Sequence, residues 1–212
     1  VVITGLGIIS PIGNDVPTFW ENLKKGVCGI ESITEFDTSI LPAHIAGKIK
    51  DFDPLQYGMD KAFVRKQGIF TQYGVAAAFQ AMADSGLHSQ GEDANIDPFR
   101  LGVYVGSGIG GFEIMYREIA KMVEDPSGQW ISPMFIPTMI SNIAAGHIAI
   151  KNFAQGPCLD IVTACATSSH CIGEAFRAIA GGHADAIITG GCEYATIPVG
   201  IAGFANAKAL SR

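Results

Sequence analysis

The sequence predicts an α/β protein built around a parallel sheet, and three observations support this. Short apolar, β-branched runs alternate with helical patterns along much of the chain, as βαβ units require. Hydrophobic residues make up 48% of the 212 residues and charged residues only 16%, which suits strands that are covered by helices on both faces. The 26 glycines are typical of tight turns between such elements.

The first elements are predicted from local signals. Val1 to Leu6 is apolar and β-branched and precedes a glycine-rich loop, which predicts a buried strand. A helix is predicted from Pro17 to Lys25, because Thr18 and Glu21 have capping-box spacing and two lysines fill the last turn. Residues 27–58 carry mixed short signals and are expected to be irregular.

The rest of the chain is predicted to alternate helices and strands. Asp60 to Ser85 has apolar residues at helical spacing, which predicts one long or two short helices with a stop at Gly86. After a polar loop, the predicted elements are strand Leu101–Val105, helix Phe112–Val123, loop Glu124–Pro137, helix Met139–Phe153, strand Cys158–Thr163, helix Thr167–Ala180 and strand Ala184–Thr189.

Charge and composition argue against several classes of function. A formal net charge of −6 and the absence of any Lys/Arg run longer than a pair argue against nucleic-acid binding. The apolar runs are far shorter than the roughly 20 residues that a bilayer requires, and no basic signal-peptide start is present, so we expect a cytoplasmic protein without a membrane span. Five cysteines without a C-x-x-C pair argue against a disulfide framework and a zinc ribbon, and we expect no metal site.

The segment GPCLDIVTACATSSHCIGEAF carries the strongest chemical signal. A predicted strand ends at Thr163, a turn of small residues contains Cys165, and a helix begins almost at once. A thiol at that position faces the unpaired amides and the positive end of a helix, which favour a nucleophilic thiolate. The other four cysteines are expected to be small buried hydrophobes. His170 lies five residues further on, about 140° around a helix axis, so we expect a packed or capping histidine rather than a base for Cys165.

Several longer motifs make the chain resemble the β-ketoacyl-acyl carrier protein synthases. TGLGIISPIGN, GSGIGG, TACATSSHCIGEAF, ADAIITGGCE and PVGIAGFANAKALS follow the order and spacing of that family, and GSGIGG and GIAGF are most similar to its condensing enzyme II subgroup. The resemblance implies a thiolase-like fold, in which residues 1–212 form the N-terminal half of a five-layered αβαβα architecture with a mixed five-stranded sheet. The C-terminal half, with two histidines, a lysine and a second oxyanion amide, is absent from this sequence.

The resemblance also implies a reaction. Cys165, in the T-A-C-x-(S/T)-S motif, is the acylated nucleophile of a 3-oxoacyl-acyl carrier protein synthase in fatty acid elongation. Malonyl-carrier protein is decarboxylated and condensed with the acyl group on Cys165, an activity that this half alone is not expected to show. The substrates are carried on the phosphopantetheine of acyl carrier protein, and no metal or redox cofactor is required. A homodimer is implied, joined through Cys158–Val162, with Ile131–Pro137 reaching toward the neighbouring acyl pocket.

The loop after the predicted strand Leu101–Val105 fits the pattern G-x-G-x-x-G, which can indicate a dinucleotide site. The acidic residues that would have to bind the ribose, Glu124 and Asp125, fall in a loop after a helix instead of on a second strand. We therefore do not predict a nucleotide site. The resemblance instead places the loop along an acyl tunnel, where Ile109 acts as a gate and Gly108 lines the pocket.

Two further sets of residues follow from the resemblance. The acyl pocket is completed by Gly200 and Phe204 of the GIAGF segment. The carrier protein is strongly acidic and needs a local basic site, for which the candidates are Lys61, Arg65, Lys66 and Lys208.

Other functions stay open at this point. A polyketide-type ketosynthase would share the same motifs. A non-condensing, thiolase-like partner subunit would share the fold but usually lacks the cysteine, so Cys165 argues against it. A cysteine hydrolase would need a histidine within reach of Cys165 in this same half, which helical spacing denies to His170.

Overall fold

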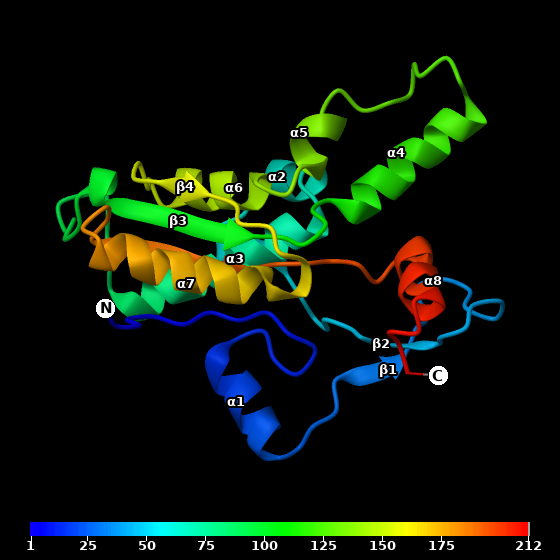
Figure 1. Cartoon of the computed structure of the whole chain (residues 1–212), viewed down its shortest axis with the longest axis horizontal. Helices are drawn as coiled ribbons and strands as arrows, with labels where there is room; N and C mark the ends of the chain where they lie inside the picture. Colours follow the sequence, from blue (N-terminus) through cyan, green and yellow to red (C-terminus); the bar gives the residue numbers. More distant parts are fainter. Residues whose placement is uncertain (212) are drawn as a thin grey trace. The chain divides into compact units, whose positions relative to one another are not determined.

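The computed structural model describes residues 1–211, which form two compact units (Figure 1). The larger unit contains Val1–Gly7 and Asp53–Tyr194, and the smaller unit contains Ile8–Phe52 and the chain from Ala195 onward. Within the described residues no helix is both long and apolar enough to cross a membrane.

A three-stranded parallel sheet forms the centre of the larger unit. In spatial order its strands are β4 (Cys158–Leu159), β3 (Leu101–Gly106) and β5 (Ala186–Gly191). Every residue of the central strand β3 is buried, and Val103 pairs with Cys158 on one side and Ile188 on the other. The mixed sheet of five strands implied by the resemblance is therefore not found in residues 1–211, where this sheet has three strands, all parallel.

Helices pack on both faces of this sheet (Figure 1). They are α3 (Ile69–Ser85), α6 (Ile143–Lys151) and α7 (Thr167–Ala180). Tyr104 packs on Cys171 of α7. Because side chains alternate along a strand, Val103 and Val105 face the opposite side, where α6 lies against β3. The apolar run at Leu101–Val105 thus forms the predicted strand, buried on two faces.

The predicted strand at Val1–Leu6 is wrong. The segment instead lies against α3, where the Leu6 N–H donates to Asp84 Oδ2 at 2.9 Å. A Cβ added to Gly5 would come within 2.1 Å of the Ala81 carbonyl oxygen. Backbone that lies on a helix has no neighbouring strand to pair with, so β-branched composition alone does not produce a strand.

The remaining helices of the larger unit are short or irregularly connected. They are α2 (Lys61–Lys66), α4 (Phe112–Glu124), α5 (Phe135–Met139) and the 3₁₀ helices η1 (Pro54–Tyr57), η2 (Pro98–Arg100) and η3 (Ala164–Ala166). Helices α2 and α3 confirm the two-helix form of the prediction for Asp60–Ser85. Gly86 ends α3 with a φ of 64°, a left-handed conformation that glycine adopts at little cost.

The predicted helix Met139–Phe153 is divided in the structure. Helix α5 occupies the end of the predicted loop Glu124–Pro137, and α6 starts only after a break. At the break the Met139 carbonyl oxygen accepts a hydrogen bond from the Gly111 N–H at 2.9 Å, and Ile140 is extended with a ψ of 142°. Contact with the loop after β3 therefore overrides the helical periodicity of the sequence.

The two outer strands also differ from their predictions. Strand β4 is two residues long, not the six of Cys158–Thr163, because its partner β3 pairs only with Cys158 and Leu159. Beyond it the Thr163 N–H donates to the Thr167 hydroxyl at 2.9 Å, a bond of the following turn. Strand β5 begins two residues later than the predicted Ala184–Thr189 and ends two residues later.

The smaller unit holds α1 (Val16–Lys24), β1 (Ile30–Ser32), β2 (Ile45–Gly47) and α8 (Pro198–Asn206). The helix α1 was predicted, but the predicted capping box was wrong. Asp15 caps the helix, its Oδ1 accepting the Thr18 N–H at 2.7 Å, which starts the helix two residues before Thr18. Strands β1 and β2 form an antiparallel pair within the region expected to be irregular.

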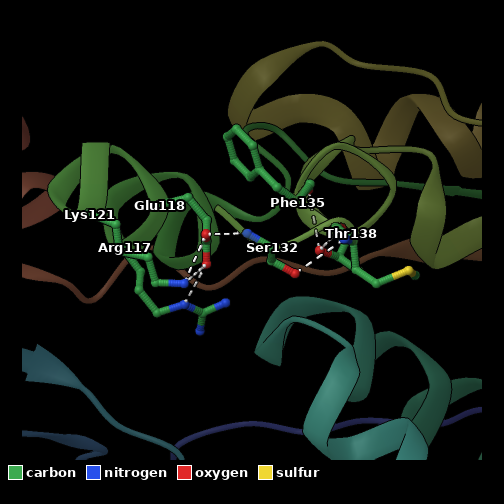
Figure 2. Close-up of polar contacts among 7 residues, drawn as sticks. Arg117, Glu118, Lys121, Ser132, Phe135 and Thr138 are labelled. Carbon is green, nitrogen blue, oxygen red and sulfur yellow. Dashed lines mark hydrogen bonds and ion pairs between the residues drawn. The ribbon is translucent and has the colours of Figure 1, made fainter. Parts of the chain in front are cut away.

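The buried carboxylate of Glu118 holds the segment that follows α4 against this helix (Figure 2). The Glu118 side chain is 1% exposed and accepts hydrogen bonds from Lys121 Nζ at 2.8 and 2.9 Å, Arg117 Nε at 3.1 Å and the Ser132 N–H at 2.9 Å. Burial by itself would raise the pKa of Glu118, but the hydrogen bonds from Lys121, Ser132 and Arg117 lower it to about 2. The residues after α4 are thereby tied back to the helix.

We expect Glu118→Gln to lower the free energy of unfolding of the whole protein by about 2 kcal/mol at pH 7, because Lys121 and Arg117 lose their charge partner. The pKa of Glu118 is depressed in the folded state, so its contribution is present above the unfolded-state pKa and is lost as the pH falls toward the folded value of about 2. Urea unfolding at pH 7 and at pH of about 3.5 should therefore show a smaller penalty in acid.

Glu21→Gln is the matched control, because the pair of Glu21 with Lys24 is exposed and should contribute less than about 1 kcal/mol. An equal penalty for Glu118→Gln at both pH values would contradict the assignment.

Candidate active site

The three parallel strands end at one edge of the sheet, and each is followed by a turn or loop that could contribute to an active site. β4 leads into the turn that contains Cys165, β3 leads into the loop Ser107–Gly111, and β5 leads into Cys192 and Glu193. The Cys192 N–H donates to the Gly106 carbonyl oxygen at 3.0 Å, which extends the pairing of β5 with β3 to this edge. The carboxyl ends of parallel strands are the usual place for ligand sites in α/β proteins.

The turn that contains Cys165 is held in a strained conformation. Cys165 lies in η3, and α7 starts at Thr167, as predicted. Ala164 has a φ of +52°, in the left-handed region that costs a residue with a side chain on the order of 1 kcal/mol. The buried Thr167 hydroxyl, which accepts the Thr163 N–H, and the Ala166 N–H, which donates to the Thr163 carbonyl at 3.1 Å, hold the turn closed. Cys165 is exposed on this turn.

The prediction of a packed or capping histidine is wrong for His170, which is exposed, while α7 starts without a side-chain cap. The His170 Nδ1 is hydrogen-bonded to the hydroxyl of Thr163, at the start of the turn. That bond ties the first helical turns of α7 to the end of the preceding segment. The ring nitrogen is thus engaged by a threonine, which does not support a role as the base of a cysteine hydrolase.

The other cysteines differ from Cys165 in their surroundings. Burial raises the pKa of the Cys171 and Cys192 thiols. Partial burial, with the charge of Asp160 nearby, also raises the pKa of Cys158, although this residue keeps part of its surface exposed. Cys28 is exposed as well, so the expectation that all four are buried is wrong for Cys28 and Cys158. Only Cys165, among the five, is exposed at a strand-to-helix turn.

The glycine-rich loop is shaped by contact with its own chain. A Cβ on Gly106 would lie 2.5 Å from Thr167 Cγ2, and one on Gly111 would lie 2.8 Å from the Met139 Cα atom. Gly110 has a φ of +83°, which favours glycine. These contacts explain the glycines without a bound phosphate.

The amides of the loop are also engaged within the chain. The Ile109 N–H donates to Glu193 Oε2 at 3.0 Å, the Gly110 N–H to the Ser107 hydroxyl at 2.9 Å, and the Gly111 N–H to the Met139 carbonyl at 2.9 Å. A phosphate cradle presents such N–H groups to its ligand. In this loop the Ile109, Gly110 and Gly111 N–H groups instead donate to acceptors of the chain itself.

The proposed pocket residues lie in both units. Gly108 and Ile109 belong to the larger unit, and Ile109 is 36% exposed. Gly200 and Phe204 belong to α8 in the smaller unit, where Gly200 is buried and Phe204 is 39% exposed. The neighbours of Gly200 along α8, Ile201 among them, pack on the segment around Ile33.

The four basic residues are likewise divided. Lys61, Arg65 and Lys66 are exposed together on α2, and Lys208 is exposed just after α8 in the other unit. None of them takes part in an ion pair within residues 1–211. The same part of the chain contains no group of three or more His, Cys, Asp or Glu side chains arranged to hold a metal ion.

Glu193 was not identified from the sequence. Its carboxylate accepts hydrogen bonds from the Ile109 N–H and from the Ser107 hydroxyl, which donates to Oε1 at 3.2 Å. The available signal was an acidic residue directly after a strand of the parallel sheet, in TGGCE. Its partners lie more than 80 residues earlier in the chain, so spacing could not reveal them.

The chain is similar to known ketosynthases in both sequence and structure. The family described as "Beta-ketoacyl synthase, N-terminal domain" matches residues 1–212. The 3-oxoacyl-(acyl-carrier-protein) synthase 2 proteins of Vibrio cholerae and Staphylococcus aureus are each 46% identical to the chain over its full length and are covered to 50%. The solved structure "The ishigamide ketosynthase/chain length factor" has a TM-score of 0.85 at 26% identity, over 99% of this chain and 51% of that one.

The chain spans about half the length of the curated relatives it matches. Its arrangement of sheet and helices is that of a solved ketosynthase structure. Together with the match over all 212 residues, these findings show that the chain belongs to the β-ketoacyl synthase family, of which it represents the N-terminal domain.

Proposed function

We propose that the whole protein is a 3-oxoacyl-acyl carrier protein synthase of fatty acid elongation, an acyltransferase with Cys165 as its nucleophile. One observation carries the proposal: Cys165 is exposed on a strained turn at the carboxyl edge of the sheet, at the start of α7. The names and 46% identity of the curated relatives support the reaction class. This chain would supply the nucleophile, and the C-terminal half would supply the histidines that promote decarboxylation.

The first stage of the proposed reaction transfers an acyl group. The Cys165 thiolate attacks the carbonyl carbon of an acyl-carrier protein thioester, and the tetrahedral oxyanion accepts a hydrogen bond from the Cys165 amide and one from the C-terminal half. The carbon–sulfur bond to phosphopantetheine breaks, and its thiolate leaves with the carrier protein and takes up a proton. The acyl chain remains as a thioester on Cys165.

The second stage forms the new carbon–carbon bond. Malonyl-carrier protein loses carbon dioxide, and the electron pair left behind forms a carbanion equivalent at the α-carbon. This carbon attacks the acyl thioester, the Cys165 thiolate leaves, and 3-oxoacyl-carrier protein is released. The two stages together therefore need no metal or redox cofactor.

We extend the proposal to the assembly of the enzyme. In the whole protein the parallel sheet is part of a five-layered αβαβα thiolase-like fold. Further strands join it there to make a mixed sheet of five strands. A cytoplasmic homodimer forms through Cys158–Val162, which the position of β4 at the edge of the sheet and the exposed Leu159 and Val162 side chains support. The segment Ile131–Pro137 would then reach toward the acyl pocket of the other subunit.

A polyketide-type ketosynthase is the second candidate, because neither the family match nor the similarity to the ishigamide ketosynthase/chain length factor structure distinguishes the two kinds of acyl chain. It would use the same cysteine and the same chemistry on different chains. The lower identity to that structure, 26% against 46%, makes fatty acid elongation the stronger proposal. A non-condensing partner subunit is disfavoured by Cys165.

Cys165 should be the one cysteine acylated when the whole protein is incubated with acyl-carrier protein, and the preferred target of cerulenin-like electrophiles. Cys165→Ala should reduce formation of 3-oxoacyl-carrier protein by about a thousandfold or more, because the acyl intermediate is lost. Cys28→Ser, which replaces another exposed cysteine, is the control and should retain activity. Peptide mapping that places the acyl group on Cys158 or Cys171 would refute the assignment.

Ile109→Phe should shorten the range of acyl primers that the whole protein accepts. The added ring fills space that a methylene chain must cross, so long primers should lose kcat/KM at least tenfold more than the shortest ones, as roughly expected for overpacking. The measurement is the ratio of kcat/KM for long and short acyl-carrier proteins, with Ile109→Val as the control. Equal effects on all primer lengths would show that Ile109 does not gate the tunnel.

Charge reversal at Arg65 and Lys208 should raise the KM for acyl-carrier protein several-fold, mainly at low salt, if α2 and the residues after α8 receive the acidic carrier. Labelling of Cys165 by a small electrophile should not change. Lys25→Glu, which reverses an exposed cation at the end of α1, is the matched control. Unchanged use of the carrier-linked substrate in low-salt buffer would place the docking site elsewhere.

A further inference from the structure

Glu193 is the carboxylate that bonds directly to the loop between β3 and α4. Its Oε2 atom accepts the N–H of Ile109 at 3.0 Å, and its Oε1 atom accepts the hydroxyl of Ser107 at 3.2 Å. The same hydroxyl accepts the N–H of Gly110 at 2.9 Å, so the hydrogen bonds run from Gly110 through Ser107 to the carboxylate. Both halves of the loop are therefore tied to one side chain.

The loop also contacts the turn that carries the nucleophile. A Cβ placed on Gly108 would lie 3.1 Å from Glu193 Oε2 and 3.3 Å from the carbonyl oxygen of Ala164, the residue before Cys165. Glycine at this position thus lets the loop fit between the carboxylate and the nucleophile turn. A shift of the Glu193 carboxylate would therefore displace Ile109 and Gly108 first.

The partners of Glu193 explain why its loss should loosen this loop. Glu193 takes part in no ion pair within residues 1–211, so the donors named here are the groups that balance its charge. Partial burial raises the pKa of Glu193, and the hydrogen bonds from Ser107, Tyr194, Ile109 and Gly108 act against that rise. Ser107 is 1% exposed, so its hydroxyl cannot replace the carboxylate with bulk water.

We propose that Glu193 is a positioning residue: its carboxylate holds the Ser107–Gly111 loop against the nucleophile turn and thereby fixes the place of Ile109, which sets the acyl chain lengths that the enzyme distinguishes. This rests on the proposed function for the role of Ile109, but the attachment of the loop to Glu193 does not. Glu193 itself does not touch the reacting atoms in this assignment.

The first test measures the attachment without any catalytic turnover. Amide hydrogen exchange at Ile109 in the whole protein should be about tenfold faster in Glu193→Ala than in the parent, as roughly expected for the loss of its hydrogen bond to the carboxylate. Exchange at Gly110 should rise less, because its N–H keeps the Ser107 hydroxyl, which loses only its own acceptor. Glu193→Gln keeps an acceptor oxygen for the Ile109 N–H and should restore most of the protection. Glu113→Ala is the matched control, because the Glu113 carboxylate accepts the Ile69 N–H at 2.7 Å at the start of α3. It should speed exchange at Ile69 and leave the loop unchanged.

The second test measures chain-length selectivity. The ratio of kcat/KM for long and short acyl-carrier proteins should move several-fold toward unity in Glu193→Ala, and should stay within about twofold of the parent in Glu193→Gln and Glu113→Ala. A uniform loss of kcat at all chain lengths would indicate a structural role only and would overturn the proposal. If Glu193→Ala does not fold, Ser107→Ala removes the bridging hydroxyl and should speed exchange at Gly110 while Ile109 stays protected.

The outcomes separate this inference from the proposed function. Faster exchange at Ile109 in a protein that neither acylates Cys165 nor condenses would support the attachment and refute the function. Normal condensation with unchanged exchange and an unchanged chain-length ratio in Glu193→Ala would overturn the inference and leave the function intact. Equal exchange rates in Glu193→Gln and Glu193→Ala would show that the acceptor oxygen is not what holds the loop.

Discussion

The site depends on the parallel pairing of β3 with β4 and β5. Because the three strands run in one direction, their carboxyl ends meet at one edge, and segments that lie far apart in the sequence are brought together there. The start of α7 lies very close to that edge, because β3 and β5 end in glycines. A Cβ on Gly106 would lie 2.5 Å from Thr167 Cγ2, and one on Gly191 would lie 2.9 Å from Ser168 Cβ. Side chains at either glycine would push the start of α7, and with it Cys165, away from the strand ends.

The same edge shows how the structure uses its polar groups. A strained turn around Ala164 is kept in place by a threonine on each side, and a loop rich in glycine is kept in place by a carboxylate, so neither depends on a bound ligand. In a phosphate-binding loop the backbone N–H groups are free to bind the ligand. In this loop they donate to Glu193, to Ser107 and to backbone carbonyls. Pre-formed segments of this kind suit a reaction in which a flexible chain must be placed beside one thiol.

The parts of the fold that depend on local signals could be predicted from the sequence. The bounds of α7 and the place of Cys165 follow from a strand, a small-residue turn and a helical pattern in direct succession. Two of the failures have long-range causes: Val1–Leu6 lies on α3 instead of beside a strand, and the helix predicted at Met139 is broken by a hydrogen bond from Gly111. Glu193 was missed for the same reason, since an acidic residue gives no local sign of partners that only sheet pairing brings near.

In the function proposed here, this edge of the sheet holds the acyl intermediate. A crystal structure of the whole protein after reaction with a long-chain acyl-carrier protein, or with a stable analogue, tests it most directly. We expect continuous electron density from Cys165 Sγ that passes beside Gly108 and Ile109, with Glu193 still bonded to the loop. Density for the chain that starts at another cysteine, or that leaves Cys165 on the side away from the Ser107–Gly111 loop, would contradict it.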